Sequence, residues 1–245
     1  MSEHDPAADY PAADCPAADP HDCPAVRSGE AARLVACVRR EPYLLRALDA
    51  VAASGLPGAW IGAGVIRDVV WGQQHGGFDP ASVRDVDVAF FDAGDLSSER
   101  DRAAQRVLAG LAALPWEATN QAAVHTWYHG HFGGPPVPPF TRVHDAVATW
   151  PETATCVAIR LAPRPAGEDG PASEDGPAGD DRPAGEDHPA SENGRIEVCA
   201  PHGLADLLSM TWRRNPVRVS EEVSRARLAR MASRWPRLTI VPLAS

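Results

Sequence analysis

Two aspartates, Asp85 and Asp87, stand one residue apart in an otherwise apolar run and could together hold a divalent cation. Strand side chains alternate, so the two carboxylates are expected to point the same way while Val86 and Val88 face the core. Close carboxylates repel each other, and a cation that also bridges substrate phosphates relieves that repulsion. The other interpretation is a surface strand with two solvated aspartates. The segment upstream favours the cation site.

That segment is a glycine turn formed by Gly62, Ala63 and Gly64. It follows an expected strand at residues 59–62 and precedes an amphipathic helix at residues 64–72. Glycines let backbone N–H groups approach a phosphate at a helix N-terminus, where the helix dipole also favours an anion. The order of strand, turn, helix and aspartate strand therefore predicts a phosphate and metal site.

The run from Ala63 to Asp68 resembles the Gly-Gly-x-Val-Arg-Asp box of tRNA CCA-adding enzymes and poly(A) polymerases, with Ala63 in place of the first glycine. Together with the aspartate strand, it looks like the head of the polymerase-β-like nucleotidyltransferases. Other segments are similar to a small bacterial family of nucleotidyltransferase-like proteins, namely residues 60–92, 120–128, 150–155 and 200–207. The resemblance implies an α+β (mixed α/β) fold, a polymerase-β-like nucleotidyltransferase palm with flanking helices.

The same resemblance implies a reaction in which a nucleoside monophosphate moves from an NTP to an acceptor hydroxyl. Two Mg²⁺ or Mn²⁺ ions would be held by Asp85, Asp87 and a third carboxylate from a later strand. We expect Glu197 to be that third carboxylate, because its two apolar neighbours can face the core and leave it to the cleft. An exposed strand glutamate is the alternative for Glu197, and Glu117 is the next candidate.

Nucleotide contacts are expected from the glycine turn and from three further residues. Gly62, Ala63 and Gly64 would cradle the triphosphate. Arg67 lies one helical turn later, where it would bind phosphate oxygens or form an ion pair with Asp68 or Asp85. Asn120 is either a turn residue or a cleft amide. His125, with Trp127 and Tyr128 after it, either contacts the nucleobase or ribose or packs in the core.

Two low-complexity segments distort the composition. The N-terminus repeats Pro-Ala-Ala-Asp, and residues 165–194 repeat an acidic hexapeptide. Neither holds the large apolar residues that offset ordering entropy, so both are expected to be disordered. Residues 1–26 are then a tail, and residues 27–245 form a single domain interrupted by the repeat at 165–194. Few apolar residues and many charges also make each segment solvated.

The formal charge of −10 mostly reflects these segments. Residues 1–25 hold six acidic residues, and residues 165–194 hold nine acidic residues and one arginine. The rest of the chain keeps 18 of the 33 acidic and 22 of the 23 basic residues, a net charge of +4. This suits a nucleotide but is too small to predict a nucleic-acid footprint. Arginines after residue 220 fall around an expected helix that is either solvated or faces RNA.

The pattern of apolar residues predicts alternating helices and strands. We expect helices near residues 29–40, 43–54, 64–72, 97–114, 141–149, 203–212 and 220–234. We expect strands near residues 59–62, 85–91, 117–119, 155–161, 195–199 and 238–241. The five cysteines are irregularly spaced, which predicts a reduced cytoplasmic protein. The chain has no 18-residue apolar run and starts with acidic residues, so we expect neither a membrane segment nor a signal peptide.

Two other function classes stay open. One is a catalytically inactive nucleotide-binding or regulatory module of the same fold. The other is a toxin- or antitoxin-type protein that binds a partner. For an active enzyme, the acceptor could be tRNA, a protein or a small molecule, because acceptor choice comes from appended elements without a recognisable motif. The sequence leaves the oligomeric state open as well.

Overall fold

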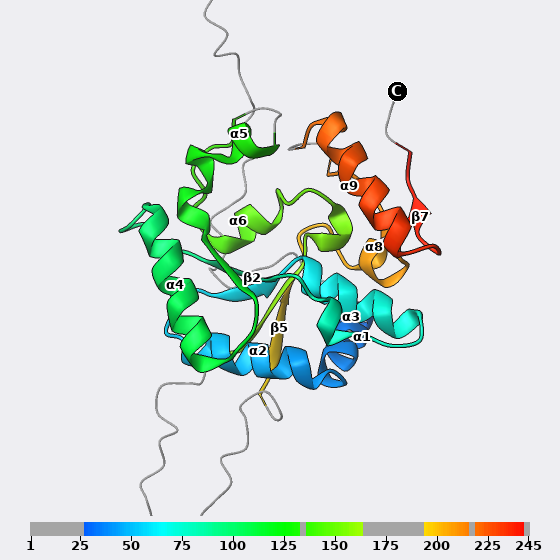
Figure 1. The fold of residues 1–245 in the computed structure, drawn as a ribbon, viewed down its shortest axis with the longest axis horizontal. Coiled ribbons are helices and arrows are strands. Elements are labelled where there is room, and N and C mark those ends of the chain that lie inside the picture. The colour runs from blue at the N-terminus through cyan, green and yellow to red at the C-terminus, as the bar shows by residue number, and fades with distance from the viewer. Residues whose placement is uncertain (1–26, 133–135, 164–193, 216–218, 243–245) are drawn as a thin grey trace, which may run out of the picture.

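The computed structural model describes residues 27–132, 136–163, 194–215 and 219–242, and a five-stranded sheet lies at its centre (Figure 1). The strands are β1 (Trp60–Gly62), β2 (Val86–Phe90), β3 (Trp116–Asn120), β4 (Ala158–Leu161) and β5 (Ile196–Cys199). Their order across the sheet is β3-β2-β1-β4-β5. β2 and β3 are parallel, and the other neighbours are antiparallel. The mixed sheet with its helices confirms the predicted α+β class.

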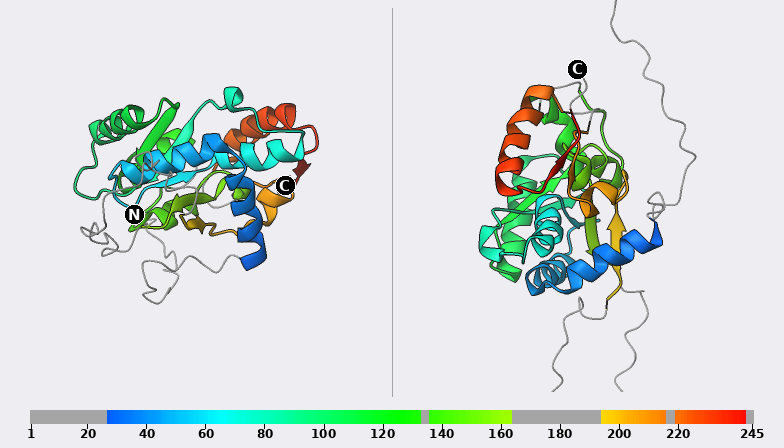
Figure 2. Two further views of the ribbon diagram at one scale, coloured as in Figure 1. Left: turned by 90° about the horizontal axis from the view of Figure 1, so that it is seen from below. Right: turned by 90° about the vertical axis from the view of Figure 1, so that its right-hand side faces the viewer.

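Helices pack on both sides of this sheet. They are α1 (Ser28–Arg39), α2 (Pro42–Ala53), α3 (Gly64–Gln74), α4 (Ser98–Leu111), α5 (Tyr128–Phe132), α6 (Val143–Val147), α8 (Ala205–Leu208) and α9 (Glu221–Arg234). Short 3₁₀ turns are η1 (Pro80–Ser82), η2 (Gln121–Thr126) and η3 (Thr153–Thr155). In Figure 1, α1 and α2 run below the sheet, whereas α5, α6 and α9 lie above it. Figure 2 shows from two further sides that α9, drawn in red, lies at one edge of the fold, near the C-terminal end of the chain.

The main core lies between the sheet and the N-terminal helices. α2 begins at Pro42, whose fixed φ and missing N–H suit a first helical turn. Leu44 and Leu48 lie four residues apart on α2, so both point to the same side, and both are buried with Ile61 of β1. Each such side chain contributes about 1.5–3 kcal/mol through burial. Trp71 of α3 donates its indole N–H to the carbonyl of Leu207 at 2.8 Å and so joins α3 to α8.

Most predicted elements are present, with one correction at the C-terminal end. The helix expected at 203–212 ends at Leu208, because Met210 has a left-handed φ of 53° that no α-helix continues through. Residues Thr211–Trp212 instead form β6, which pairs in parallel with β7 (Thr239–Ile240). No helix in the described part of the chain is long and apolar enough to span a membrane.

The chain leaves the sheet before the acidic repeat and returns to it after the repeat at a neighbouring position. β4 and β5 are antiparallel partners, and Leu161 pairs with Ile196. Strands were predicted before and after the repeat, at residues 155–161 and 195–199, and β4 and β5 confirm them; that they are direct neighbours is a finding of the structure. The expected disorder of the repeat and of the N-terminal tail falls on residues outside those described.

Candidate active site

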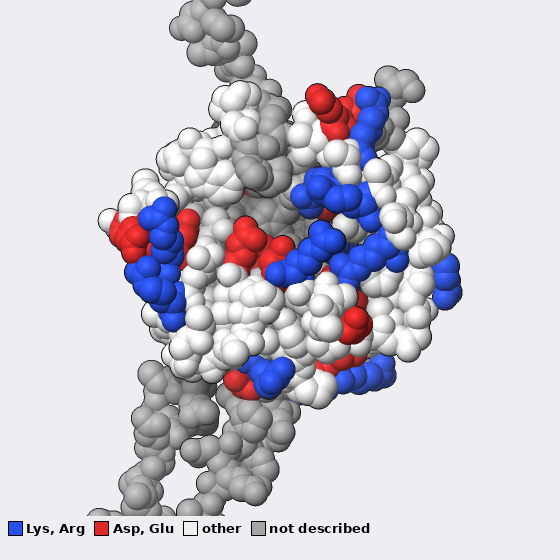
Figure 3. All heavy atoms as spheres, in the orientation of Figure 1, with Lys and Arg blue, Asp and Glu red and all other residues white. Residues whose placement is uncertain are grey.

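A pocket of about 910 Å³ opens where the glycine turn, β2 and β3 face helix α9. Segments far apart in the sequence line it, from Ala63 at the turn to Arg234 at the end of α9. Figure 3 shows acidic side chains and arginines next to each other around this hollow. The pocket therefore combines groups that attract cations with groups that attract anions.

Asp85 and Asp87 meet at the N-terminal end of α3. Asp85 directly precedes β2, and Asp87 lies within it. A Cβ atom on Gly64 would lie 3.8 Å from Oδ1 of Asp85 and 3.8 Å from Oδ2 of Asp87. The two carboxylates therefore converge on the same small space, which stays open because residue 64 has no side chain.

Glu117 brings a third carboxylate to this space. β2 and β3 run parallel in a register that places Glu117 beside Asp87, and both residues line the pocket. Burial, followed by the charges of Asp85 and Glu117, raises the pKa of Asp87 to about 7, although the Gly64 backbone and Arg67 oppose the shift. Asp85 and Glu117 thus add negative charge around Asp87, and a positive charge in the pocket would offset it.

Glu197 is not brought to the aspartates. It lies on β5 and forms ion pairs of 2.8 Å with Arg160 and 2.6 Å with Arg195. β5 is an edge strand separated from β2 by β1 and β4, and Glu197 does not line the pocket. The expectation that Glu197 faces the cleft is thus replaced by the position of Glu117, the second candidate from the sequence.

The residues of the glycine turn have different surroundings. Ala63 has φ 56° and ψ −116°, a backbone conformation that glycine adopts more readily, which is consistent with a glycine at this place in the box. Ala63 and Gly64 line the pocket. Gly62 does not, because the indole of Trp150 covers its Cα: a Cβ on Gly62 would lie 2.2 Å from Cη2 of that ring.

Arg67 forms the ion pair that was one of its two expected roles. Its Nε and Nη2 donate to Oδ1 of Asp68 at 2.9 and 2.7 Å, and the pair is buried. Arg234 of α9 binds the other carboxylate oxygen of Asp68 at 2.9 Å. Arg67 still lines the pocket, so the ion pair positions its guanidinium next to the aspartates.

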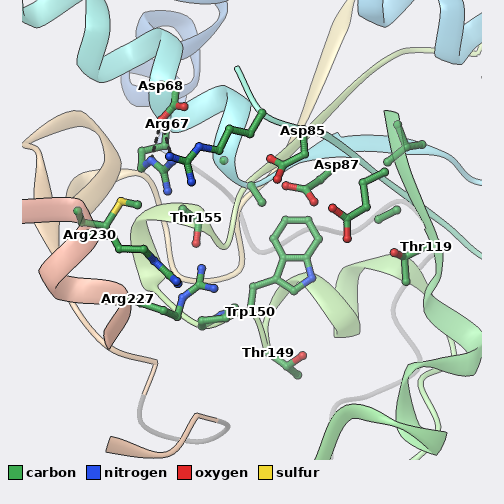
Figure 4. A pocket seen from close by; sticks show the side chains of 18 of the residues that line it. Arg67, Asp68, Asp85, Asp87, Thr119, Thr149, Trp150, Thr155, Arg227 and Arg230 are labelled. Atoms are coloured by element: carbon green, nitrogen blue, oxygen red, sulfur yellow. Dashed lines mark hydrogen bonds and ion pairs between the residues drawn. The ribbon is translucent and has the colours of Figure 1, made fainter. Parts of the chain in front are cut away.

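Helix α9 places three arginines in the pocket, an arrangement that the sequence left undecided. Arg227, Arg230 and Arg234 line it, whereas Arg225 is exposed and pairs with Glu221. These three recur at spacings of three and four, so they share one face of the helix. In Figure 4, Arg227 and Arg230 lie on one side of Asp85 and Asp87. The same spacing in the sequence was the available signal, but it does not say which face is solvated.

Asn120 and His125, expected near the nucleotide, do not line the pocket. The Oδ1 atom of Asn120 accepts from the backbone N–H groups of Asp92 and Ala122, and its Nδ2 donates to the carbonyls of Asp92 and Asp95. Asn120 is thus a buried turn residue. The Nδ1 atom of His125 lies 3.0 Å from the carbonyl of Ala122. Trp127 and Tyr128, the neighbours considered with His125, do line the pocket.

Comparison with known proteins identifies a family and a shared fold. A nucleotidyltransferase family model matches residues 49–168 and 189–240. A solved structure, described as an NMR structure that reveals a CCA-adding enzyme head domain, is 23% identical, with a TM-score of 0.61, and the match covers 86% of this chain and 96% of that one. A search of curated proteins found no match. The structural likeness shows the shared fold, and the family match extends over most of the sequence, so the chain belongs to the nucleotidyltransferase family.

Proposed function

We propose that the protein is a metal-dependent nucleotidyltransferase that moves a nucleoside monophosphate from an NTP to an acceptor hydroxyl. The observation that carries this proposal is the convergence of Asp85 and Asp87 at Gly64. They lie beside an arginine wall, which is the face of α9 formed by Arg227, Arg230 and Arg234. In the reaction, a bond forms between the acceptor oxygen and the α-phosphorus. The bond from that phosphorus to the bridging oxygen breaks, and pyrophosphate leaves.

The carboxylates fit Mg²⁺ or Mn²⁺ through their chemistry. Mg²⁺ is commonly held by one or two carboxylates together with substrate phosphates and water. Within the described residues, no group of three or more His, Cys, Asp or Glu side chains is arranged to hold a metal ion. Asp85 and Asp87 would hold the cation, and Glu117, beside Asp87 in the sheet, is the candidate for a third ligand. When bound, such ions polarise the α-phosphate and acidify the acceptor hydroxyl.

The arginine wall suits the triphosphate. Arg227 forms an ion pair with Glu152, and Arg234 forms one with Asp68. These ion pairs hold their guanidinium groups at the pocket, so little rearrangement is needed when phosphates arrive. Arg230 is exposed and lines the pocket. Charge at these positions would stabilise the negative charge that develops on the leaving pyrophosphate.

Calorimetric titration with a non-hydrolysable NTP and Mg²⁺ tests the site. Asp87→Asn should remove Mg²⁺-dependent binding, because one of the two converging carboxylates is lost. Glu222→Gln is the matched control, since it also removes one negative charge but lies exposed on α9 and does not line the pocket. Equal affinity in the parent and in Asp87→Asn would contradict the proposed metal site.

A second pair of variants tests the arginine wall. Arg230→Gln should weaken binding of the NTP at least about tenfold, because a charge-assisted hydrogen bond contributes about 1.5–3 kcal/mol. Arg225→Gln, on the same helix but outside the pocket, should leave the affinity unchanged. If both variants weaken binding equally, the effect comes from net charge rather than from the pocket.

A nucleotide-binding module without turnover is the second candidate. It is supported by the lack of a three-carboxylate metal group among the described residues. Transfer of label from an α-labelled NTP to small molecules, protein or tRNA separates the two candidates. Binding without transfer to any acceptor would favour the module, and the labelled fraction would identify the acceptor class of an active enzyme.

A further inference from the structure

Trp150 occupies the space where residue 62 would carry a side chain. A Cβ on Gly62 would lie 2.2 Å from Cη2 and 2.6 Å from Cζ3 of the indole, closer than Cβ atoms approach other atoms. Gly62 lies in β1, next to the strand that carries Asp87, and the register pairs these two residues directly. The absence of a side chain at Gly62 thus brings the Trp150 ring close to the carboxylates.

The ring is held in this position from several sides. It packs against a small apolar cluster that includes Val147, Cys156 and Ala158. The backbone that carries the ring is fixed as well: the backbone N–H of Trp150 donates to the carbonyl of Val147 at 3.2 Å, and the thiol of Cys156 donates to the backbone carbonyl of Trp150 at 3.3 Å. The ring is nevertheless only partly buried, and it lines the pocket. Trp150 is therefore a supported aromatic surface that faces the pocket.

The position of Trp150 divides the pocket into two chemically different ends. In Figure 4, Arg227 and Arg230 lie to one side, Thr119 lies to the other, and Trp150 lies between them, close to Asp87. Thr119 lies beyond Trp150, and further uncharged residues line the same pocket, namely Gln121, Val124, Trp127, Tyr128 and Thr149. None of these six described residues carries a formal charge, and Glu117, two residues before Thr119 on β3, is acidic and would repel a phosphate. This end suits an uncharged, flat group rather than phosphate.

We infer that Trp150 is the platform on which the nucleobase of the donor NTP stacks. The inference rests on the proposed function, since it takes the β- and γ-phosphates to the arginine side and the α-phosphate to Asp85 and Asp87. Base stacking on an aromatic side chain accepts any base, because every base has a π-face. The role of Gly62 is then to make room for Trp150, rather than to cradle the triphosphate itself.

Titrations with two probes test this assignment. One probe is a non-hydrolysable NTP with Mg²⁺, and the other is inorganic tripolyphosphate with Mg²⁺, which has no base. Trp150→Leu should weaken binding of the NTP at least about fivefold, and Trp150→Phe should weaken it less. Neither variant should change binding of tripolyphosphate more than about twofold, since phosphate contacts lie elsewhere. Gly62→Ala should act like Trp150→Leu, because its new methyl group displaces the ring.

Trp116→Leu is the matched control, because Trp116 is also a partly buried tryptophan but does not line the pocket. Its affinity for the NTP should stay close to that of the parent. The assignment is overturned if Trp150→Leu binds the NTP as tightly as the parent does, or if it loses affinity for both probes equally. It is also overturned if Trp116→Leu loses as much affinity for the NTP as Trp150→Leu does. Should Trp150→Leu fail to fold, the NTP affinity of Trp150→Phe relative to tripolyphosphate decides. If the parent binds tripolyphosphate as tightly as it binds the NTP, the stacking role of Trp150 is contradicted and the proposed function is not. If the parent binds neither probe, the proposed function is contradicted as well.

Discussion

Arg227 of α9 donates two hydrogen bonds to the buried carboxylate of Glu152, at 2.5 Å from Nε and 3.2 Å from Nη2. Glu152 is 3% exposed. Burial alone would raise the pKa of this carboxyl, but the hydrogen bond and charge of Arg227, together with the charge of Arg67 and a hydrogen bond from Thr155, lower it. The pair connects the segment before η3 to the helix that carries the arginine wall, so it positions that wall over the pocket.

Removing Arg227 should destabilise the protein, because it leaves a buried charge without its partner. Arg227→Leu should lower the free energy of unfolding by about 3 kcal/mol, measured by urea denaturation at pH 7. Arg225→Leu, which removes an exposed ion pair with Glu221, should cost under about 1 kcal/mol. Because the folded pKa of Glu152 is lowered, its stabilisation is present above the unfolded pKa and is lost as the pH falls through the folded pKa. The difference between parent and Arg227→Leu should therefore shrink in acid, and a constant difference would contradict this account.

Asp87 should destabilise the protein without ligand at neutral pH. Its pKa rises from 3.8 to about 7 on folding, so the folded state binds the proton more tightly than the unfolded state. The cost is absent below pH 4, grows as the pH rises towards 7 and is constant above. Asp87→Asn should then raise the free energy of unfolding at pH 8 by on the order of 1–3 kcal/mol and change it little at pH 4. Thermal unfolding at both pH values, with chelator present, measures this; a lower Tm at pH 8 would speak against carboxylate crowding.

Glu117 and Glu197 should respond differently to the same substitution. Glu117→Gln should lower transfer a hundredfold or more, about 3 kcal/mol in the barrier, and leave NTP affinity within about threefold. Glu197→Gln should leave transfer unchanged and reduce thermal stability, because it breaks the pairs with Arg160 and Arg195. The measurement is label transfer alongside Tm. If transfer depends on Glu197 and not on Glu117, then Glu197 and not Glu117 is the third carboxylate.

Replacing Ala63 with glycine should stabilise the folded protein. Its φ of 56° with ψ of −116° is unfavourable for a residue with a Cβ, and glycine removes that strain. Ala63→Gly should raise the free energy of unfolding by about 1 kcal/mol, measured by denaturant unfolding. Ala109→Gly in α4 is the control and should lower it by about 1 kcal/mol, since glycine is a poor helix former. Destabilisation by both variants would mean that the conformation of Ala63 is not strained.

The long connection between β4 and β5 should be replaceable. Leu161 and Ile196 are already neighbours in the sheet, so a short turn can join them. Reducing residues 165–194 to about five should raise the free energy of unfolding by at most about 1.5 kcal/mol, because loop-closure entropy grows only with the logarithm of loop length. Denaturant unfolding of the shortened protein measures the change, and a markedly lower stability would show that the repeat contributes contacts.

The sequence by itself determined the elements whose signals are local. The glycine turn, the helix after it and the aspartate strand were predicted close to their observed bounds, because turn chemistry and side-chain periodicity act within a few residues. The position of Asp85 and Asp87 on one face follows from the period of a strand. The chain order of these elements also carried the resemblance to nucleotidyltransferases, which the family match confirms.

Only the tertiary structure decided which distant residues join the aspartates. Glu117 and Glu197 both alternate with apolar neighbours on a strand, so their local patterns are equivalent; the strand order brings Glu117 beside Asp87 and takes Glu197 to the far edge. The arginine face of α9 depends in the same way on how that helix docks, through Glu152 and Asp68. Pairing and docking between segments as far apart as those of Asp68 and Arg234 are set by the packing of the whole core, and a local pattern contains no information about them.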